Sequence, residues 1–146
     1  MKKATADQIS LDHFTYDVPI VLQTDASNLG IGATLINRHP PPVGDRIVGL
    51  VSHAFNATEA RWKTIEQEAW AIVFAIIFFR SLLWGHNFLV ETDHRNLTFI
   101  HSGTSSKLTR WSLLLQSMSF AISYLPGEQN VTADALSRSP RGLRMG

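Results

Sequence analysis

The sequence predicts an α/β fold in which one sheet combines antiparallel and parallel strands and is flanked by helices. Three short apolar runs joined by brief connections lie between residues 18 and 55, which is typical of an antiparallel meander. A long segment with helical periodicity, 56–81, then separates the third run from a fourth. This strand–helix–strand order is a crossover, so the fourth strand is expected to lie parallel to the first.

The first predicted strand opens the segment VPIVLQTDASNLGIG. Its apolar run, Val18–Leu22, leads into the turn-rich cluster Asp25–Asn28, which predicts a buried strand. A second strand is expected over Ile31–Ile36. When Asp25 is considered alone, an Asx turn to the backbone that follows it is the simplest interpretation.

A stiff loop, His39–Asp45, follows the second strand and contains three prolines in succession, which cannot extend a strand. Ile47–Phe55 is rich in β-branched residues and is the third predicted strand. A helix begins after the cap residue Asn56, with Glu59 in its first turn, and is expected to continue to about Ser81.

One face of this helix is expected to pack on the sheet, because apolar residues repeat there at helical spacing. They are Ile65, Ala69, Ile72, Ile76 and Phe79. The opposite side is also apolar, through Trp70, Phe74, Ile77 and Phe78. Such a helix is expected to be central, to be flanked by other helices, or to contact another domain.

The C-terminal half is expected to contain two more strands. The fourth strand is Asn87–Thr92, and the fifth is Phe120–Leu125. Between them, Asn96–Ile100 is interpreted as a short helix or turn, and Lys107–Met118 as a helix whose apolar stripe can cover the outer face of the long helix. A short final helix is predicted over Asn130–Ser137.

The composition excludes several kinds of chemistry. With 146 residues, of which 45% are hydrophobic and 17% charged, the chain fits one folded domain. It has no cysteine, which excludes disulfides, zinc–thiolate sites and thiol catalysis. Its 13 Lys and Arg residues nearly balance 12 Asp and Glu, so a nucleic-acid partner would need a local basic surface. The N-terminus lacks a signal-peptide core, and the longest apolar run, Ala69–Phe79, is too short to span a membrane.

Four acids occupy comparable positions in the predicted fold. Asp25 ends the first strand, Asp93 ends the fourth, Glu68 lies on the long helix, and Asp134 opens the final helix. If the first and fourth strands are parallel neighbours, their acids lie at the sheet edge where open α/β folds bind ligands. Converging carboxylates repel one another unless cations neutralise them, and their hard oxygen atoms favour Mg²⁺ or Mn²⁺ over Zn²⁺.

Helical geometry does not decide which glutamate of the long helix joins the other acids. Glu66 and Glu68 fall at opposite margins of the sheet-facing stripe, and only one of them is expected to reach the other acids.

Five blocks of the chain resemble, in order, the ribonuclease H domain of gypsy-type LTR retrotransposon reverse transcriptases. They are LQTDASNLGIGATL, SHAFNATEARWKTIEQEAWAIVFAI, FLVETDHRNLTFI, LTRWSLLLQ and YLPGEQNVTADALSR. The resemblance extends from about Pro19 to Arg138 and assigns the glutamate to Glu68, in EAWAIV. The other matching acids are Asp25 in TDAS, Asp93 in TDHRNL and Asp134 in ADALSR.

The resemblance implies a ribonuclease H fold, with a mixed five-stranded sheet flanked by helices, and cleavage of the RNA strand of RNA–DNA hybrids. In that family two divalent cations, Mg²⁺ or Mn²⁺ and roughly 3.5–4 Å apart, clamp the scissile phosphate, and the products carry a 5′-phosphate and a 3′-hydroxyl. Asp25, Glu68, Asp93 and Asp134 are thereby implied as catalytic residues and metal ligands. Many ribonucleases H also have a histidine before the last helix. Here Pro126–Asn130 contains none, which implies slower catalysis or partial substitution by Glu128.

Six further residues are candidates for substrate contact, since a hybrid is held chiefly through its phosphates and its shape. They are Ser27, Asn28, Arg95, Asn96, Lys107 and Arg110. For Lys107 and Arg110 a solvated helix face is an equally good interpretation, and for Ser27 and Asn28 a turn role suffices. Trp111 belongs to an apolar stripe and is expected in the core.

The expected organisation is a connector from a polymerase region (1–18), the ribonuclease H domain (19–138) and a C-terminal tail (139–146). The expected partners are an RNA–DNA hybrid and the polymerase portion of the same polyprotein, with no membrane. Dimerisation with a second copy of the chain stays open. An intracellular, cytoplasmic location, within virus-like particles, follows from the same resemblance.

Two other functions remain open at this level. The first is a catalytically weak or inactive module that binds hybrids, tethers the polyprotein or dimerises. The apolar outer face of the long helix favours it, whereas retention of all four acids favours the enzyme. The second is a different nuclease of the same fold, such as an integrase or resolvase, which would use fewer acids and lack these five blocks. Fold alone does not separate them.

Overall fold

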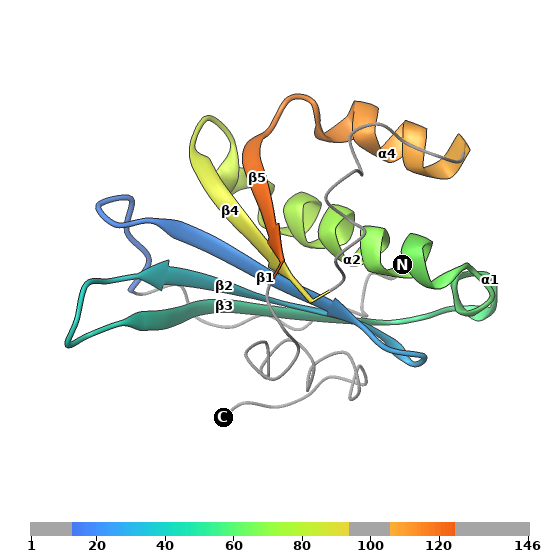
Figure 1. Cartoon of the computed structure of the whole chain (residues 1–146), viewed down its shortest axis with the longest axis horizontal. Coiled ribbons are helices and arrows are strands. Elements are labelled where there is room, and N and C mark those ends of the chain that lie inside the picture. The colour runs from blue at the N-terminus through green and yellow to red at the C-terminus, as the bar shows by residue number, and fades with distance from the viewer. Residues whose placement is uncertain (1–12, 94–105, 125–146) are drawn as a thin grey trace.

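A computed structural model describes residues 13–93 and 106–124, which form one sheet and its covering helices (Figure 1). The strands are β1 (Ile20–Ala26), β2 (Gly30–Arg38), β3 (Asp45–Ala54), β4 (Asn87–Thr92) and β5 (Ser119–Tyr124). The helices are α1 (Ala57–Ala60), α2 (Thr64–Phe78), α3 (Arg80–Leu83) and α4 (Ser106–Leu115).

The sheet has the order β3-β2-β1-β4-β5 and mixes both strand directions. The pairs β1–β2 and β2–β3 are antiparallel, whereas β1–β4 and β4–β5 are parallel. Short connections dictate the antiparallel meander, and the helical crossover between β3 and β4 returns the chain parallel to β1. The predicted mixed five-stranded sheet is therefore confirmed.

The loop between β2 and β3 is closed by a glycine at a backbone angle that other residues avoid. Gly44 has φ of 69°, and its carbonyl accepts a hydrogen bond from the amide of His39 at 3.0 Å. The Pro41–Pro42 peptide bond in this loop is cis. As predicted, the prolines lie outside both strands.

The prediction of one helix from 57 to about 81 is wrong, because the helical segment is interrupted at two places and forms three helices. Arg61–Lys63 separates α1 from α2, and Lys63 has an extended backbone with ψ of 154°. A new helix start is stabilised there because Glu66 accepts a hydrogen bond from the Lys63 amide at 3.2 Å. The second break is at Phe79, a single residue between α2 and α3.

The core lies between the sheet and α2. Figure 1 shows α2 and α4 on the same side of the sheet, with α2 next to the strands. The predicted sheet-facing residues Ala69, Ile72 and Ile76 are buried together with Leu22 and Leu35 of the sheet. Burial of this apolar surface is the main favourable term in folding.

Helix α4 covers part of the outer face of α2, as predicted. Trp111 is buried and its ring stacks on Trp70 of α2, with 5.5 Å between ring centroids. Farther along α2, Ile77 and Phe78 remain exposed, as does the nearby Trp84. The outer face of α2 is therefore covered at its N-terminal half and open at its C-terminal end.

Several expectations fall outside the described residues: the short helix or turn at 96–100, the final helix at 130–137 and the tail at 139–146. Helix α4 ends at Leu115 rather than Met118. Phe14 and Tyr16, within the predicted connector, contact the domain: Phe14 packs on the core, and the Tyr16 hydroxyl donates to the carbonyl of Leu82. Within the described residues, no helix has the length and apolar character needed to cross a membrane.

Candidate active site

Two acids lie side by side where neighbouring parallel strands end. Strand β1 pairs with β4 up to Thr24, which lies opposite Thr92. The next residue of β1 is Asp25, and the next residue after β4 is Asp93. The parallel register therefore brings both carboxylates to the same edge of the sheet, as predicted from their positions after the two apolar runs.

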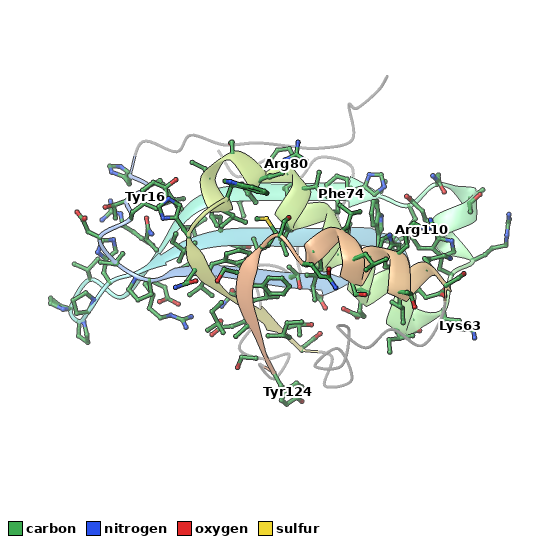
Figure 2. All side chains as sticks on the ribbon, turned by 90° about the horizontal axis from the view of Figure 1, so that it is seen from above. Tyr16, Lys63, Phe74, Arg80, Arg110 and Tyr124 are labelled. Carbon is green, nitrogen blue, oxygen red and sulfur yellow. The ribbon has the colours of Figure 1, made fainter. Side chains whose placement is uncertain are left out.

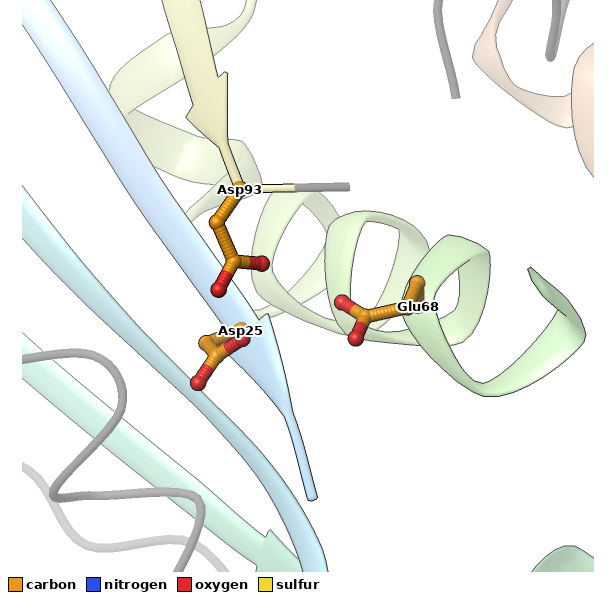
Figure 3. A group of neighbouring side chains, drawn as sticks. All are labelled: Asp25, Glu68 and Asp93. Carbon is orange, nitrogen blue, oxygen red and sulfur yellow. The ribbon is translucent and has the colours of Figure 1, made fainter. Parts of the chain in front are cut away.

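The third acid of the group comes from α2. Figure 3 shows Glu68 pointing from the helix toward Asp25 and Asp93. Each of the three residues offers a carboxylate oxygen, and these oxygens all lie within 4.8 Å of one another. Asp25 is 2% exposed and Glu68 7% exposed, whereas Asp93 is partly open to solvent.

This set of side chains suits a hard divalent cation. Three carboxylates so close together carry negative charges that repel at short range, and a cation between them would remove that repulsion. Oxygen-only ligands match Mg²⁺ or Mn²⁺, and the partial exposure of Asp93 leaves a side open to water and substrate. The residues present therefore fit the metal that the sequence predicted.

Glu66 does not belong to this group. Its carboxylate accepts from the Lys63 amide, which caps α2, and lies 3.4 Å from the ammonium group of Lys107 on α4. The structure thus separates two glutamates that helical periodicity left equivalent.

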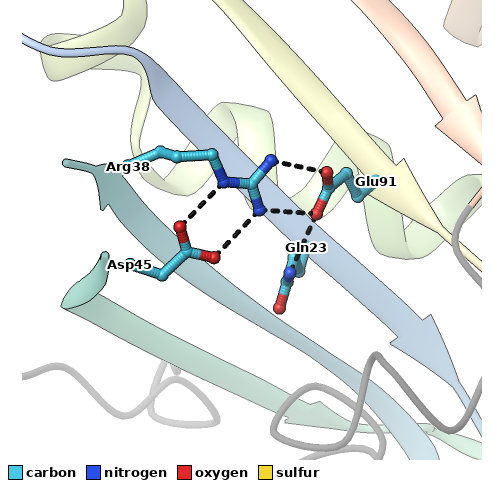
Figure 4. A network of polar contacts seen from close by, with 4 residues as sticks. All are labelled: Gln23, Arg38, Asp45 and Glu91. Atoms are coloured by element: carbon cyan, nitrogen blue, oxygen red, sulfur yellow. Dashed lines mark hydrogen bonds and ion pairs between the residues drawn. The ribbon is translucent and has the colours of Figure 1, made fainter. Parts of the chain in front are cut away.

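A second polar group lies on the sheet and includes residues two positions before Asp25 and Asp93. Figure 4 shows its four side chains. Gln23 of β1 donates to Glu91 of β4 at 2.9 Å. Arg38 of β2 donates to both oxygens of Glu91, at 2.8 and 3.2 Å, and to both oxygens of Asp45, at 2.8 and 2.9 Å. Four side chains from four strands therefore form one network.

The network holds Glu91 in its charged form. Burial alone would raise the pKa of Glu91, but the hydrogen bonds from Arg38 and Gln23 oppose burial and keep this pKa below its ordinary value. The hydrogen bonds to Asp45 and Glu91 raise the pKa of Arg38 in turn. Glu91 and Arg38 therefore both carry their charges at neutral pH.

The predicted substrate-contact residues occupy different settings. The Ser27 hydroxyl accepts from the Leu29 amide at 3.1 Å within the β1–β2 turn, and Asn28 is exposed at the same turn. Lys107 lies 4.0 Å from the centre of the Trp62 ring, and Arg110 is exposed. Figure 2 shows Arg110 and Lys63 at the same end of the molecule.

The remaining predicted site residues, Arg95, Asn96 and Asp134, lie outside the described residues.

Sequence reasoning missed Gln23, Arg38 and Glu91. A signal for two of them was present, because Gln23 and Glu91 each precede a site acid by two residues and so share its face of the strand. No comparable signal marked Arg38, whose partner Glu91 lies 53 residues away in the chain.

Comparison with known proteins identifies the class of protein that carries this fold and this acid group. Residues 15–118 match the family described as the RNase H-like domain found in reverse transcriptase. The chain therefore belongs to the RNase H-like domains of reverse transcriptases. This membership confirms the resemblance predicted from the sequence blocks, while the gypsy type stays a prediction.

Relatives among retrotransposons are similar over most of the chain. The retrovirus-related Pol polyprotein from transposon 412 of Drosophila melanogaster is 40% identical over 141 residues, covering 94% of this chain. The transposon Tf2-3 polyprotein of Schizosaccharomyces pombe is 35% identical over 136 residues, covering 88%. The chain spans only 11% and 10% of the length of these relatives.

Solved structures share the fold at low sequence identity. The foamy viral protease–reverse transcriptase in complex with double-stranded DNA has a TM-score of 0.66 at 17% identity, covering 80% of this chain and 25% of that one. RNase H1 from the halophilic archaeon Halobacterium salinarum has a TM-score of 0.63 at 18% identity, covering 84% and 96%. The predicted ribonuclease H fold is thus confirmed.

Proposed function

We propose that this chain is a metal-dependent endonuclease that cleaves the RNA strand of RNA–DNA hybrids during reverse transcription. The observation that carries the proposal is the group of Asp25, Glu68 and Asp93, whose ligand oxygens lie within 4.8 Å of one another at the carboxyl edge of parallel strands. Membership in the RNase H-like family supports the same reaction.

In this proposal the three acids, joined by Asp134 from the C-terminal segment, hold two divalent cations. Divalent cations supply charge neutralisation at the scissile phosphate and activation of the attacking water. Asp25 and Asp93 extend from adjacent parallel strands, so the sheet fixes their relative position. Glu68 is held by the packing of α2 on the sheet, and Asp93 provides the side open to substrate.

The proposed substrate follows from the relatives as well as from the site. A foamy viral protease–reverse transcriptase and the LC11 RNase H1, both of this fold, have been solved in complex with RNA/DNA hybrid. We extend that substrate to this chain, with the polymerase portion of a Pol polyprotein as its covalent neighbour and a virus-like particle as its place of action. Products with a 5′-phosphate and a 3′-hydroxyl are expected from two-metal hydrolysis.

The experiment that tests this function is cleavage of a hybrid with a labelled RNA strand, with Mg²⁺ or Mn²⁺, by the wild-type chain and by Asp93→Asn. Metal-dependent nicking of the RNA strand that the substitution abolishes is the expected result. Binding of the hybrid without cleavage, both by the 146-residue chain and by the same chain fused to its polymerase domain, would contradict it.

A second candidate function is supported by one observation. Ile77, Phe78 and Trp84 are 40%, 36% and 59% exposed around the C-terminal end of α2, which suits contact with another part of a polyprotein or with a second copy. An inactive module that tethers the polyprotein or dimerises would use this surface and would show no metal-dependent cleavage of hybrids. The assay with the fused polymerase domain separates the two functions.

A further inference from the structure

Strands β1 and β4 are joined by a side-chain hydrogen bond two residues before Asp25 and Asp93, the acids near their ends. Gln23 and Glu91 are direct partners in the parallel pairing, and the Gln23 amide donates to the Glu91 carboxylate at 2.9 Å. Both side chains are buried, at 8% and 7% exposure. Because side chains alternate along a strand, this bond lies on the same face as Asp25 and Asp93 and about 7 Å before them.

Arg38 completes the connection to the rest of the sheet. Its guanidinium group binds both oxygens of Glu91 and both oxygens of Asp45, so it links β4 to β2 and β3 (Figure 4). Bidentate contacts of this kind fix orientation as well as distance. Both oxygens of the Glu91 carboxylate therefore accept hydrogen bonds, from Arg38 and Gln23, and Glu91 is not one of the three acids of the site.

We infer that Gln23, Glu91 and Arg38 are positioning residues that set the separation of the Asp25 and Asp93 carboxylates. The inference rests on the proposed function, in which those carboxylates hold divalent cations. Repulsion between Asp25 and Asp93 tends to spread the strand ends, and the hydrogen bond two residues earlier opposes that spreading. Mg²⁺ requires near-ideal ligand geometry, so a small spread of the strands weakens its binding.

The test uses substitutions that preserve charge. Gln23→Met keeps the length of the side chain and removes only the amide that donates to Glu91. Arg38→Lys keeps the positive charge but cannot bind Glu91 and Asp45 with two pairs of hydrogen bonds. Mn²⁺ binding to the 146-residue chain is measured by the paramagnetic resonance of free Mn²⁺, which requires no cleavage. In the hybrid cleavage assay, kcat and KM are measured at fixed Mg²⁺.

The matched control is Asn37→Leu at the other end of the sheet. Asn37 is fully buried, and its amide exchanges two 2.9 Å hydrogen bonds with the backbone of Thr15, opposite the start of β1. The Asn37→Leu substitution removes a buried side-chain amide, as Gln23→Met does, but leaves the hydrogen bond between β1 and β4 intact. Thermal unfolding of all three variants and of the wild type measures the cost in stability.

The expected result is about tenfold weaker Mn²⁺ binding for Gln23→Met, the lower end of the effect of losing an outer partner of a metal site. Arg38→Lys is also expected to weaken Mn²⁺ binding. The value of kcat falls in both variants while the KM for hybrid stays unchanged, and Asn37→Leu lowers stability but leaves Mn²⁺ affinity at the wild-type value.

Unchanged Mn²⁺ affinity in a folded Gln23→Met variant overturns the inference, as does an equal loss in Asn37→Leu. If Gln23→Met does not fold, Arg38→Lys decides by the same criteria. A wild-type chain that neither binds Mn²⁺ nor cleaves hybrid overturns the proposed function and this inference with it. A wild type that does both, with unaffected variants, overturns the inference alone.

Discussion

At the residue scale, the two glutamates of α2 have different roles although only one residue separates them. Glu68 joins Asp25 and Asp93, whereas Glu66 caps the helix and pairs with Lys107. The helix turns by about 100° per residue, so positions two apart point in clearly different directions.

The two glutamates are therefore expected to respond differently to the same change. Glu68→Gln removes a proposed metal ligand and is expected to lower hybrid cleavage by more than about 100-fold, beyond the loss seen for outer partners of metal sites. Glu66→Gln is expected to keep activity and to cost about 1 kcal/mol of stability, because its capping and pairing contacts weaken. Cleavage rates and thermal unfolding of both variants check this, and loss of activity in Glu66→Gln alone would contradict it.

At the element scale, α1 and α2 each begin at an N-terminal cap of their own, Asn56 and Lys63. Asn56 accepts from the Glu59 amide at 2.8 Å, and Glu59 accepts from the Asn56 amide at 3.0 Å, which forms a capping box for a helix of one turn. Trp62, within the break, packs against Trp70 and Trp111, with ring centroids 6.1 and 5.5 Å away. The break thus supplies an aromatic side chain to the interface between α2 and α4.

Loss of the first cap is expected to be measurable. Asn56→Ala removes the acceptor for the Glu59 amide and is expected to lower the free energy of unfolding by about 1 kcal/mol. Thr58→Ala is the control, because Thr58 is exposed in the same short helix. Urea unfolding of both variants checks the difference. Equal stability of the two would show that α1 does not depend on this cap.

Helix α4 buries one aromatic residue against α2. Trp111 is 6% exposed and stacks on Trp70, so Trp111→Ala is expected to cost about 3–5 kcal/mol, as for other buried aromatic truncations. Leu113→Ala, at a position 60% exposed on the same helix, is expected to stay within about 0.5 kcal/mol of the wild type. Urea unfolding followed by tryptophan fluorescence distinguishes them, and similar losses would contradict the assigned packing.

At the scale of the whole molecule, the acid group opposes folding unless a cation is present. Each pair of carboxylates at this separation repels by about 3 kcal/mol at an effective dielectric constant of about 20, less where solvent screens the partly exposed Asp93. The folded sheet brings these charges together, whereas the unfolded chain keeps them apart.

Stability is therefore expected to depend on metal. Without metal, Asp93→Asn is expected to raise the free energy of unfolding by about 1 kcal/mol, because it relieves that repulsion. With Mg²⁺, the wild type is expected to gain stability as ligand-linked folding requires, and the variant to gain less. Thermal unfolding in chelator and in Mg²⁺ checks both parts. A variant less stable than the wild type in chelator would contradict the repulsion.

The strands and the direction of β4 could be predicted from the local pattern of apolar and turn residues. Apolar runs bounded by turn residues located all five strands, within about three residues at either end. The length of the crossover correctly predicted β4 parallel to β1. The two aspartates followed from the same reasoning, because strand ends can be read from the sequence.

Two features of the structure, the interrupted helix and the polar network, were not predicted because both depend on contacts that apolar periodicity does not encode. The single long helix was wrong because a second helix start at Lys63, where Glu66 accepts from the Lys63 amide, depends on side-chain geometry that the apolar periodicity of the segment does not encode. The network of Gln23, Arg38 and Glu91 was missed because it joins residues 53 and 68 positions apart.

The sequence by itself determined the strands, the antiparallel meander of the first three, the direction of β4 relative to β1, the family, and the presence of acids near the ends of β1 and β4. These depend on side-chain periodicity, turn residues and connection length, which are local properties of the chain. Periodicity left Glu66 and Glu68 equivalent and the resemblance favoured Glu68; the tertiary structure brings Glu68, not Glu66, to the aspartates. Only the tertiary structure showed that Arg38 links Glu91 to Asp45. Those outcomes depend on the rotation of α2 over the sheet and on strand twist, which are set when distant segments pack together.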